Sequence, residues 1–133
     1  MRLVSERPVQ HADRLSDFES LLWTLERDPR LASGFANITL LDRPADVERM
    51  RTRMARAAAI VPQLRRRIFT DPGHLAPPRW IDDPEFDVAH HVRTLHLDPA
   101  RGDHGALIDA AMACCRRPWD PNRPLWEFLL VDG

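Results

Sequence analysis

The chain has 133 residues and a formal net charge of -1, and it is 44% hydrophobic and 29% charged. This length and composition suit one soluble globular domain with its own core. The nearly balanced charge excludes a chain-wide basic field, so we expect no nucleic-acid partner.

The N-terminus and the cysteines bear on localisation. The stretch Met1–Gln10 carries three charges and no apolar run, so we expect no secretory signal. No apolar stretch approaches the roughly 20 residues that a membrane helix needs. Cys114 and Cys115, the only two cysteines, are adjacent and favour a reducing compartment. We therefore expect a cytoplasmic protein, with any membrane contact peripheral and on the inner face.

The first predicted elements are a helix and a strand. Ser16 followed three residues later by Glu19 forms a capping box, which opens a helix over Leu15–Glu26. Alternating side chains over Phe35–Leu41 predict a strand.

A second helix is predicted from about Ala45 to Val61, with an apolar stripe and several arginines, before Pro62 stops it. Such an amphipathic helix could lie on an anionic membrane, but core-facing helices show the same pattern more often.

The remaining chain predicts short strands, one more helix and proline-rich loops. In chain order these are strands at Gln63–Phe69, Arg79–Asp82 and His91–Leu97, a helix at about His104–Arg117 opened by Arg101-Gly102-Asp103, a loop at Pro118–Pro124 and a strand at Leu125–Val131. The last strand is so apolar that we expect it to be covered on both faces, within a larger sheet, and prone to association if its edge is free. The mixture of elements indicates an α/β fold built of α+β layers.

The histidines His90, His91 and His96 are the first candidates for chemistry. In a strand, His90 and His96 would share one face and His91 the other. A zinc site needs three or four converging ligands. We therefore expect polar strand-edge histidines and no metal site.

The two cysteines lie in the middle of an alanine-rich predicted helix. We expect Cys114 and Cys115 to be small buried core residues. A reactive thiol, favoured by the neighbouring Arg116 and Arg117, is the alternative.

Two charged clusters remain. The run Arg65–Arg67 could contact phosphates, but so short a run is more often a solvated face. Four acidic residues surround Pro84 without the spacing of a calcium loop, and we expect surface turn acids there: Asp82, Asp83, Glu85 and Asp87.

Two longer stretches carry a family resemblance. The first is Ala76–Val88 (APPRWIDDPEFDV) closing on His91-Val92-Arg93, and the second is Pro118–Glu127 (PWDPNRPLWE) running on to Gly133. In order and spacing they resemble the N-terminal region of the bacterial wax ester synthase/diacylglycerol acyltransferase family. The resemblance covers nearly the whole chain from Leu15 onward.

The resemblance implies a partial fold of the CoA-dependent acyltransferase (chloramphenicol acetyltransferase-like) type. Residues 15–133 would form an incomplete N-terminal subdomain, and residues 1–14 a lead into it. It also implies transfer of a fatty acyl group from acyl-CoA, as co-substrate and without another cofactor, to diacylglycerol (triacylglycerol synthesis) or to a long-chain alcohol (wax ester). Peripheral contact with a membrane or lipid droplet would accompany such substrates.

In that family the second histidine of an HHxxxDG motif is the general base. This sequence lacks the motif, because His90-His91 is followed by Val92-Arg93 and His91 aligns with the family's lone His-Val. We therefore expect a truncated chain that holds no catalytic residue and is inactive alone. The residues carried over are the substrate-channel motif Pro124, Leu125 and Trp126, for which a rigid turn feeding a buried strand is the alternative role.

Two rival functions stay open. One is a non-catalytic remnant or peripheral lipid-binding module. The other is a relative of the condensation domains that act on carrier-protein thioesters, against which the W-x-D-D-P segment argues.

Overall fold

The computed structural model describes residues 13–32, 34–98 and 104–133. Most of the lead at 1–14, and the helix opening at 101–103, lie outside this range. The elements in chain order are α1 (Asp17–Leu25), α2 (Val47–Ile60), β1 (Arg66–Phe69), β2 (Arg79–Asp82), β3 (Val92–His96), α3 (His104–Arg116) and β4 (Phe128–Asp132), with 3-10 turns at Pro62–Arg65 and Val88–His90. The mixture confirms the predicted α+β class.

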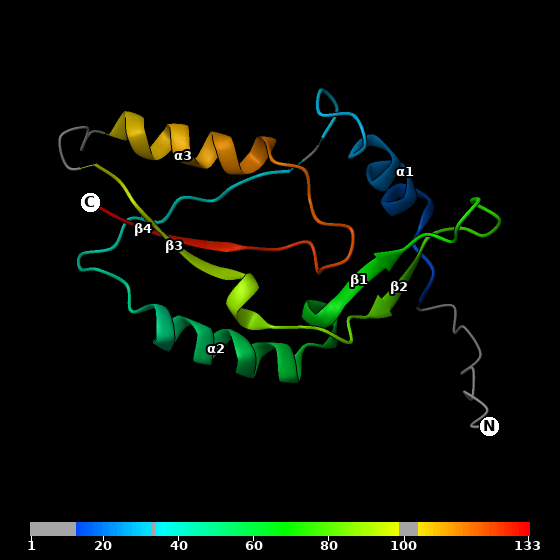
Figure 1. Cartoon of the computed structure of the whole chain (residues 1–133), viewed down its shortest axis with the longest axis horizontal. Helices are drawn as coiled ribbons and strands as arrows, with labels where there is room; N and C mark the ends of the chain where they lie inside the picture. Colours follow the sequence, from blue (N-terminus) through cyan, green and yellow to red (C-terminus); the bar gives the residue numbers. More distant parts are fainter. Residues whose placement is uncertain (1–12, 33, 99–103) are drawn as a thin grey trace.

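The strands form two small sheets. β1 pairs with β2 in antiparallel register, with Ile68 opposite Trp80. β3 pairs with β4 in parallel, with Val92 opposite Phe128, and α3 lies in the connection between them. Figure 1 shows the β3–β4 pair between α2 and α3, and the β1–β2 hairpin on the side of α1.

The first two helices begin two residues after the predicted starts at Leu15 and Ala45, and α1 begins with the predicted capping box. The Ser16 hydroxyl accepts from the Glu19 amide, and the Glu19 carboxylate accepts from the Ser16 amide at 2.7 Å. Asp46 caps α2 by accepting from two backbone amides. Trp23 Nε1 donates to Thr70 Oγ1 at 3.3 Å, which ties α1 to the end of β1.

The core is centred where α2 meets β3. Ala58 on α2 is 2% exposed and Val92, the first residue of β3, is fully buried. Arg51 Nε donates to the Val92 carbonyl at 3.2 Å. The buried residues Ala58 and Val92 and the hydrogen bond from Arg51 together hold the start of β3 in place, because close packing resists displacement. The candidate site begins at this point.

Three predicted strands differ from the structure. The strand predicted at Gln63–Phe69 starts only at Arg66, because the 3-10 turn Pro62–Arg65 takes its first residues. Residues 35–41 form irregular chain, and Phe35 is 90% exposed. A strand needs a hydrogen-bonded neighbour, and none of the described strands pairs with this segment. The strand predicted at Leu125–Val131 starts only at Phe128, because Leu125, Trp126 and Glu127 lie in irregular chain that is not paired with β3. β4 has β3 as its single strand neighbour within the described chain. That the remaining strands of its sheet lie elsewhere stays a prediction.

Across the described residues, every helix is too short or too polar to cross a bilayer.

Candidate functional site

The segment Pro124–Trp126 connects the loop after α3 to β4. Pro124 is buried, and Leu125 and Trp126 are half-buried. Trp126 Nε1 donates to the Leu64 carbonyl at 2.8 Å. Since Leu64 lies in the turn that follows α2, this bond joins two segments about 60 residues apart in sequence.

The His91 side chain contacts both the indole ring and the backbone carbonyl of Trp126. Its ring stacks on the indole with centroids 4.4 Å apart and 24° between the planes. Its Nδ1 lies 2.8 Å from the Trp126 carbonyl oxygen, and because a carbonyl only accepts, Nδ1 carries the hydrogen. Phe86 stacks on the far face of the imidazole at 5.4 Å. His91 is only 4% exposed, so the prediction of a polar strand-edge residue is wrong for it.

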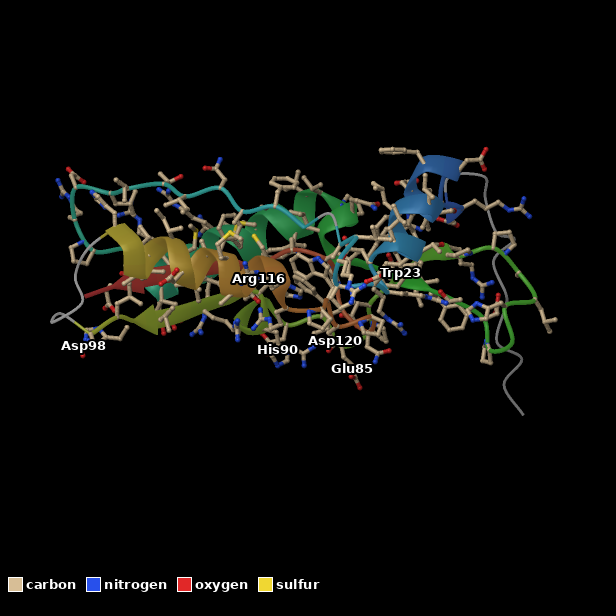
Figure 2. All side chains as sticks on the ribbon, turned by 90° about the horizontal axis from the view of Figure 1, so that it is seen from above. Trp23, Glu85, His90, Asp98, Arg116 and Asp120 are labelled. Atoms are coloured by element: carbon tan, nitrogen blue, oxygen red, sulfur yellow. The ribbon has the colours of Figure 1, made fainter. Side chains whose placement is uncertain are left out.

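The local sequence explains why the two neighbouring histidines separate. The Asp87 carboxylate accepts from the Ala89 amide at 2.8 Å and starts the 3-10 turn Val88–His90. This turn directs His91 inward and leaves His90 exposed, on the same face as Glu85 and Asp120 in Figure 2. The predicted face shared by His90 and His96 does not exist, because His90 lies in the turn and not in the strand.

Glu127 connects three elements through charge. One carboxylate oxygen accepts from Arg93 of β3 at 2.9 Å, and the other accepts from Arg117, just after α3, at 2.5 Å. The Glu127 side chain is 15% exposed. Charge-assisted bonds of this kind are among the stronger hydrogen bonds in proteins. Glu127 is therefore held both by Arg93 of β3 and by Arg117 just after the end of α3.

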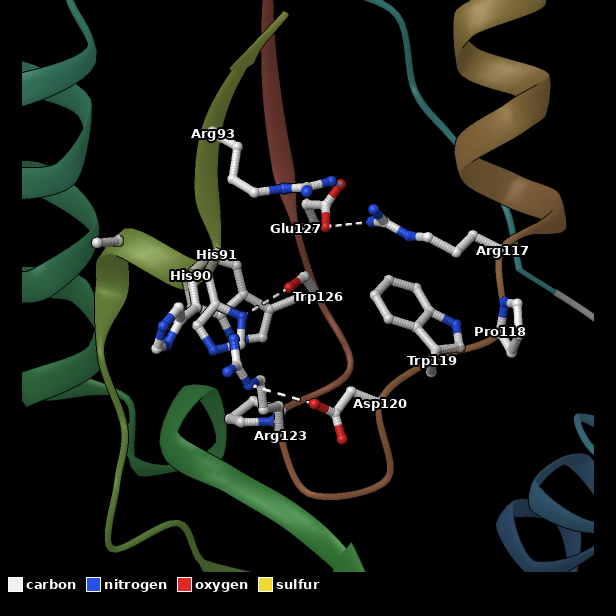
Figure 3. Close-up of a pocket in the computed structure, with 12 residues that line it drawn as sticks. His90, His91, Arg93, Arg117, Pro118, Trp119, Asp120, Arg123, Trp126 and Glu127 are labelled. Carbon is white, nitrogen blue, oxygen red and sulfur yellow. Dashed lines mark hydrogen bonds and ion pairs between the residues drawn. The ribbon is translucent and has the colours of Figure 1, made fainter.

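A cavity of about 380 Å³ opens beside this cluster. Trp119 and Trp126 contribute aromatic surface, Arg93, Arg117 and Arg123 contribute guanidinium groups, and His90 lies at its edge. Figure 3 shows Trp119 facing the stacked His91 and Trp126 across this space.

Two of the three residues of the predicted substrate-channel motif border the cavity. Pro124 and Trp126 line it, whereas Leu125 does not. Arg123 pairs with Asp120 at 3.3 Å.

The acidic turn differs from the prediction at one position. Asp83 is 6% exposed, because its backbone amide donates to the Arg65 carbonyl and its carboxylate accepts from the Glu85 amide, both at 2.9 Å. Asp82, Glu85 and Asp87 are exposed, as predicted.

The remaining candidates are dispersed. Cys114 and Cys115 are free and only half-buried, so they are not the core residues that we expected. Arg65 lies over the Phe86 ring at 5.8 Å, while Arg66 pairs with Asp13, so the arginine run does not form one solvated face. Within the described ranges, no three histidine, cysteine or acidic side chains gather as metal ligands.

Sequence reasoning missed the partners of Glu127. Arg93 and Glu127 lie in the two stretches that carry the resemblance, which is the one signal that could have singled them out. Their contact depends on the parallel pairing of β3 with β4, which places Arg93 opposite Leu129, and no local pattern predicts that register.

The comparisons with known proteins agree with one another. Residues 15–133 match the family model described as the wax ester synthase/diacylglycerol acyltransferase catalytic domain. A Mycobacterium tuberculosis H37Rv protein whose name describes it as a diacylglycerol O-acyltransferase is 35% identical over 123 residues, which are 92% of this chain and 25% of the relative. A second protein of that strain, with the same description, is 32% identical over 108 residues, or 81% of this chain and 22% of the relative.

The chain thus spans about a quarter of the length of the curated relatives that it matches. No solved structure matches it.

Proposed function

The chain belongs to the wax ester synthase/diacylglycerol acyltransferase family, and from this premise we propose that it acts within an O-acyltransferase. The reaction moves a fatty acyl group from acyl-CoA to the hydroxyl of diacylglycerol, giving triacylglycerol, or of a long-chain alcohol, giving a wax ester. The observation that carries the proposal is the family match over residues 15–133. The diacylglycerol O-acyltransferase descriptions of the relatives support the first acceptor.

In this reaction the acceptor oxygen attacks the thioester carbonyl while a base takes the hydroxyl proton. The C–S bond then breaks, and the CoA sulfur leaves with a proton. A base must reach the substrate hydroxyl directly or through one water. His91 is a poor base, because it is only 4% exposed between Phe86 and Trp126 and a substrate hydroxyl cannot reach it there.

His90 is exposed beside the cavity, but no hydrogen bond from the described residues orients its ring. We therefore assign the base to a histidine outside these 133 residues. The chain's own contribution is the wall formed by Pro124 and Trp126, held in place by His91, Leu64 and Glu127.

The lipid-binding module is the weaker alternative. The apolar stripe of α2 is directed at β3, since Ala58 is buried there and Met50 and Met54 are half-buried. A stripe that already packs against the protein is not free to enter a bilayer.

Ester formation tests the proposal. Labelled palmitoyl-CoA would be incubated with diacylglycerol or hexadecanol, together with either the gene product purified from its native host or the 133-residue chain. We expect labelled triacylglycerol or wax ester with the host protein, and none above background with the 133-residue chain.

Two results would count against the proposal. Absence of ester with either acceptor, for a folded host protein, would overturn the acyltransferase assignment. Turnover by the 133-residue chain that His90→Ala or His91→Ala abolishes would place the base inside this chain instead.

A further inference from the structure

The cavity beside Trp126 combines cations with aromatic rings, and we propose that it binds the phosphorylated adenosine end of a CoA thioester. The proposal rests on the proposed function for the identity of the ligand. The chemistry that the site recognises is a purine ring carrying phosphate monoesters.

The cationic part consists of Arg93, Arg117 and Arg123. Each guanidinium has five N–H donors in a fixed plane, a geometry that suits phosphate oxygens. Between 41 and 47% of each of these side chains remains exposed. Their contacts with acidic side chains therefore leave part of each side chain open to a ligand, and Arg93 Nε is buried with no hydrogen-bond partner among the described residues.

The two carboxylates near these arginines do not cancel them. Three guanidinium groups line the cavity against the carboxylates of Asp120 and Glu127, which leaves an excess of one positive charge. Glu127 also fixes Arg93 and Arg117 before any ligand arrives. Groups that are fixed in advance lose less entropy when they bind.

The aromatic part consists of Trp119 and Trp126. Both line the cavity, and Figure 3 shows them on opposite sides of it. His91 stacks on Trp126 and keeps the indole from rotating away. Aromatic faces of this kind stack with nucleobases. The volume of about 380 Å³ also lies in the usual range for small-molecule sites.

The other parts of the proposed substrates fit less well. A fatty acyl chain or diacylglycerol carries no anion and would bury guanidinium groups without new hydrogen bonds, which is costly. A phosphate without a base would leave both indoles unused. The combination therefore favours the nucleotide end over the acyl end.

Calorimetric titration of the 133-residue chain tests the site. The probe is adenosine 3′,5′-bisphosphate, and the comparison ligands are adenosine, inorganic phosphate and glycerol 3-phosphate, which carries the phosphate of a lipid headgroup without a base. We expect the bisphosphate to bind at least about tenfold more tightly than each comparison ligand. Equal affinity for inorganic phosphate or glycerol 3-phosphate, or no binding of the bisphosphate, would overturn the proposal.

Variants identify the residues. Arg123→Gln and Trp119→Leu should each weaken bisphosphate binding about tenfold. Neither residue contacts Glu127 among the described ion pairs, so both variants should fold. Arg116→Gln is the matched control, since Arg116 precedes Arg117 but does not line the cavity. An equal loss in Arg116→Gln, or unchanged affinity in the two site variants, would contradict the assignment.

The two proposals can fail separately. Ester formation by the host protein without bisphosphate binding by this chain would remove only the nucleotide site. Bisphosphate binding that depends on Arg123, with no ester formation by the host protein, would remove the acyltransferase proposal and leave the site.

Discussion

The segments around Trp126 and around Leu40 are both rich in apolar residues, yet they end in opposite environments. Trp126 is stacked, hydrogen-bonded at both its indole and its carbonyl, and followed by a residue held between two arginines. Leu40 is 70% exposed in irregular chain. The difference shows that apolar content alone does not order a segment, since its backbone and side chains also need partners within reach.

The largest expected effect comes from removing the centre of the ordered region. Trp126→Ala deletes the stacked ring and its bond to Leu64, and it should lower the free energy of unfolding by about 3 kcal/mol. Phe35→Ala is the control, with an expected change within about 0.5 kcal/mol because that side chain is exposed. Urea denaturation followed by circular dichroism measures both. Similar losses in the two variants would contradict the comparison.

Two substitutions of His91 separate the contribution of its hydrogen bond from that of its stacking, and both should lower stability less than Trp126→Ala does. His91→Phe keeps a ring against Trp126 but leaves the Trp126 carbonyl without its donor, which should cost about 1–2 kcal/mol. His91→Asn, which retains a donor near the position of Nδ1, tests the converse loss of stacking. Thermal melting gives both values, and a Phe variant as stable as the natural chain would show that the bond contributes nothing.

Substitutions in the exposed segment at residues 35–41 should leave the stability of the chain almost unchanged. Replacing Phe35 and Leu40 by serine together removes apolar surface that touches little else, so stability should change by less than about 0.5 kcal/mol. Binding of the dye ANS, which reports exposed apolar surface, should fall, as should self-association in sedimentation. A large drop in stability would mean that these side chains are packed in solution.

The smallest effect concerns the start of α1. Hydrogen bonds from the Ser16 backbone, and then from its hydroxyl, lower the pKa of Glu19 from its ordinary value of 4.5. Since the folded pKa is the lower one, this stabilisation is present above pH 4.5 and is lost as the pH falls through the folded value. Glu19→Gln should therefore melt slightly below the natural chain at pH 7, and the difference should shrink as the pH is lowered toward 3. A difference in melting temperature that stays the same from pH 7 to pH 3 would show that the Glu19 charge is not its cause.

Much of the fold follows from local signals. The Ser16–Glu19 capping box, the stop at Pro62 and the strand Arg79–Asp82 appear where the sequence predicts them. Each is set by residues within a few positions of one another. The strand predicted at residues 35–41 fails because pairing is not local and the described chain supplies no partner.

The candidate site was only partly predictable. The family resemblance singled out Pro124, Leu125 and Trp126 as a substrate-channel motif, which stays a prediction; Pro124 and Trp126 line the cavity and Leu125 does not. The burial of His91 was missed because it depends on the 3-10 turn Val88–His90, which directly precedes the expected strand and which the sequence analysis did not predict. The role of Glu127 was missed because Arg93 and Arg117 reach it from two other elements.

Amide hydrogen exchange on the 133-residue chain tests most directly whether the two regions differ as described. The Phe128 amide donates to the His91 carbonyl and the Leu97 amide to the Asp132 carbonyl, both at 2.7 Å, so both should exchange slowly. The amides of residues 36–41 should exchange near the unfolded rate, at least about a hundredfold faster. Equal protection of the two regions would show that residues 35–41 have found backbone partners and would contradict the contrast.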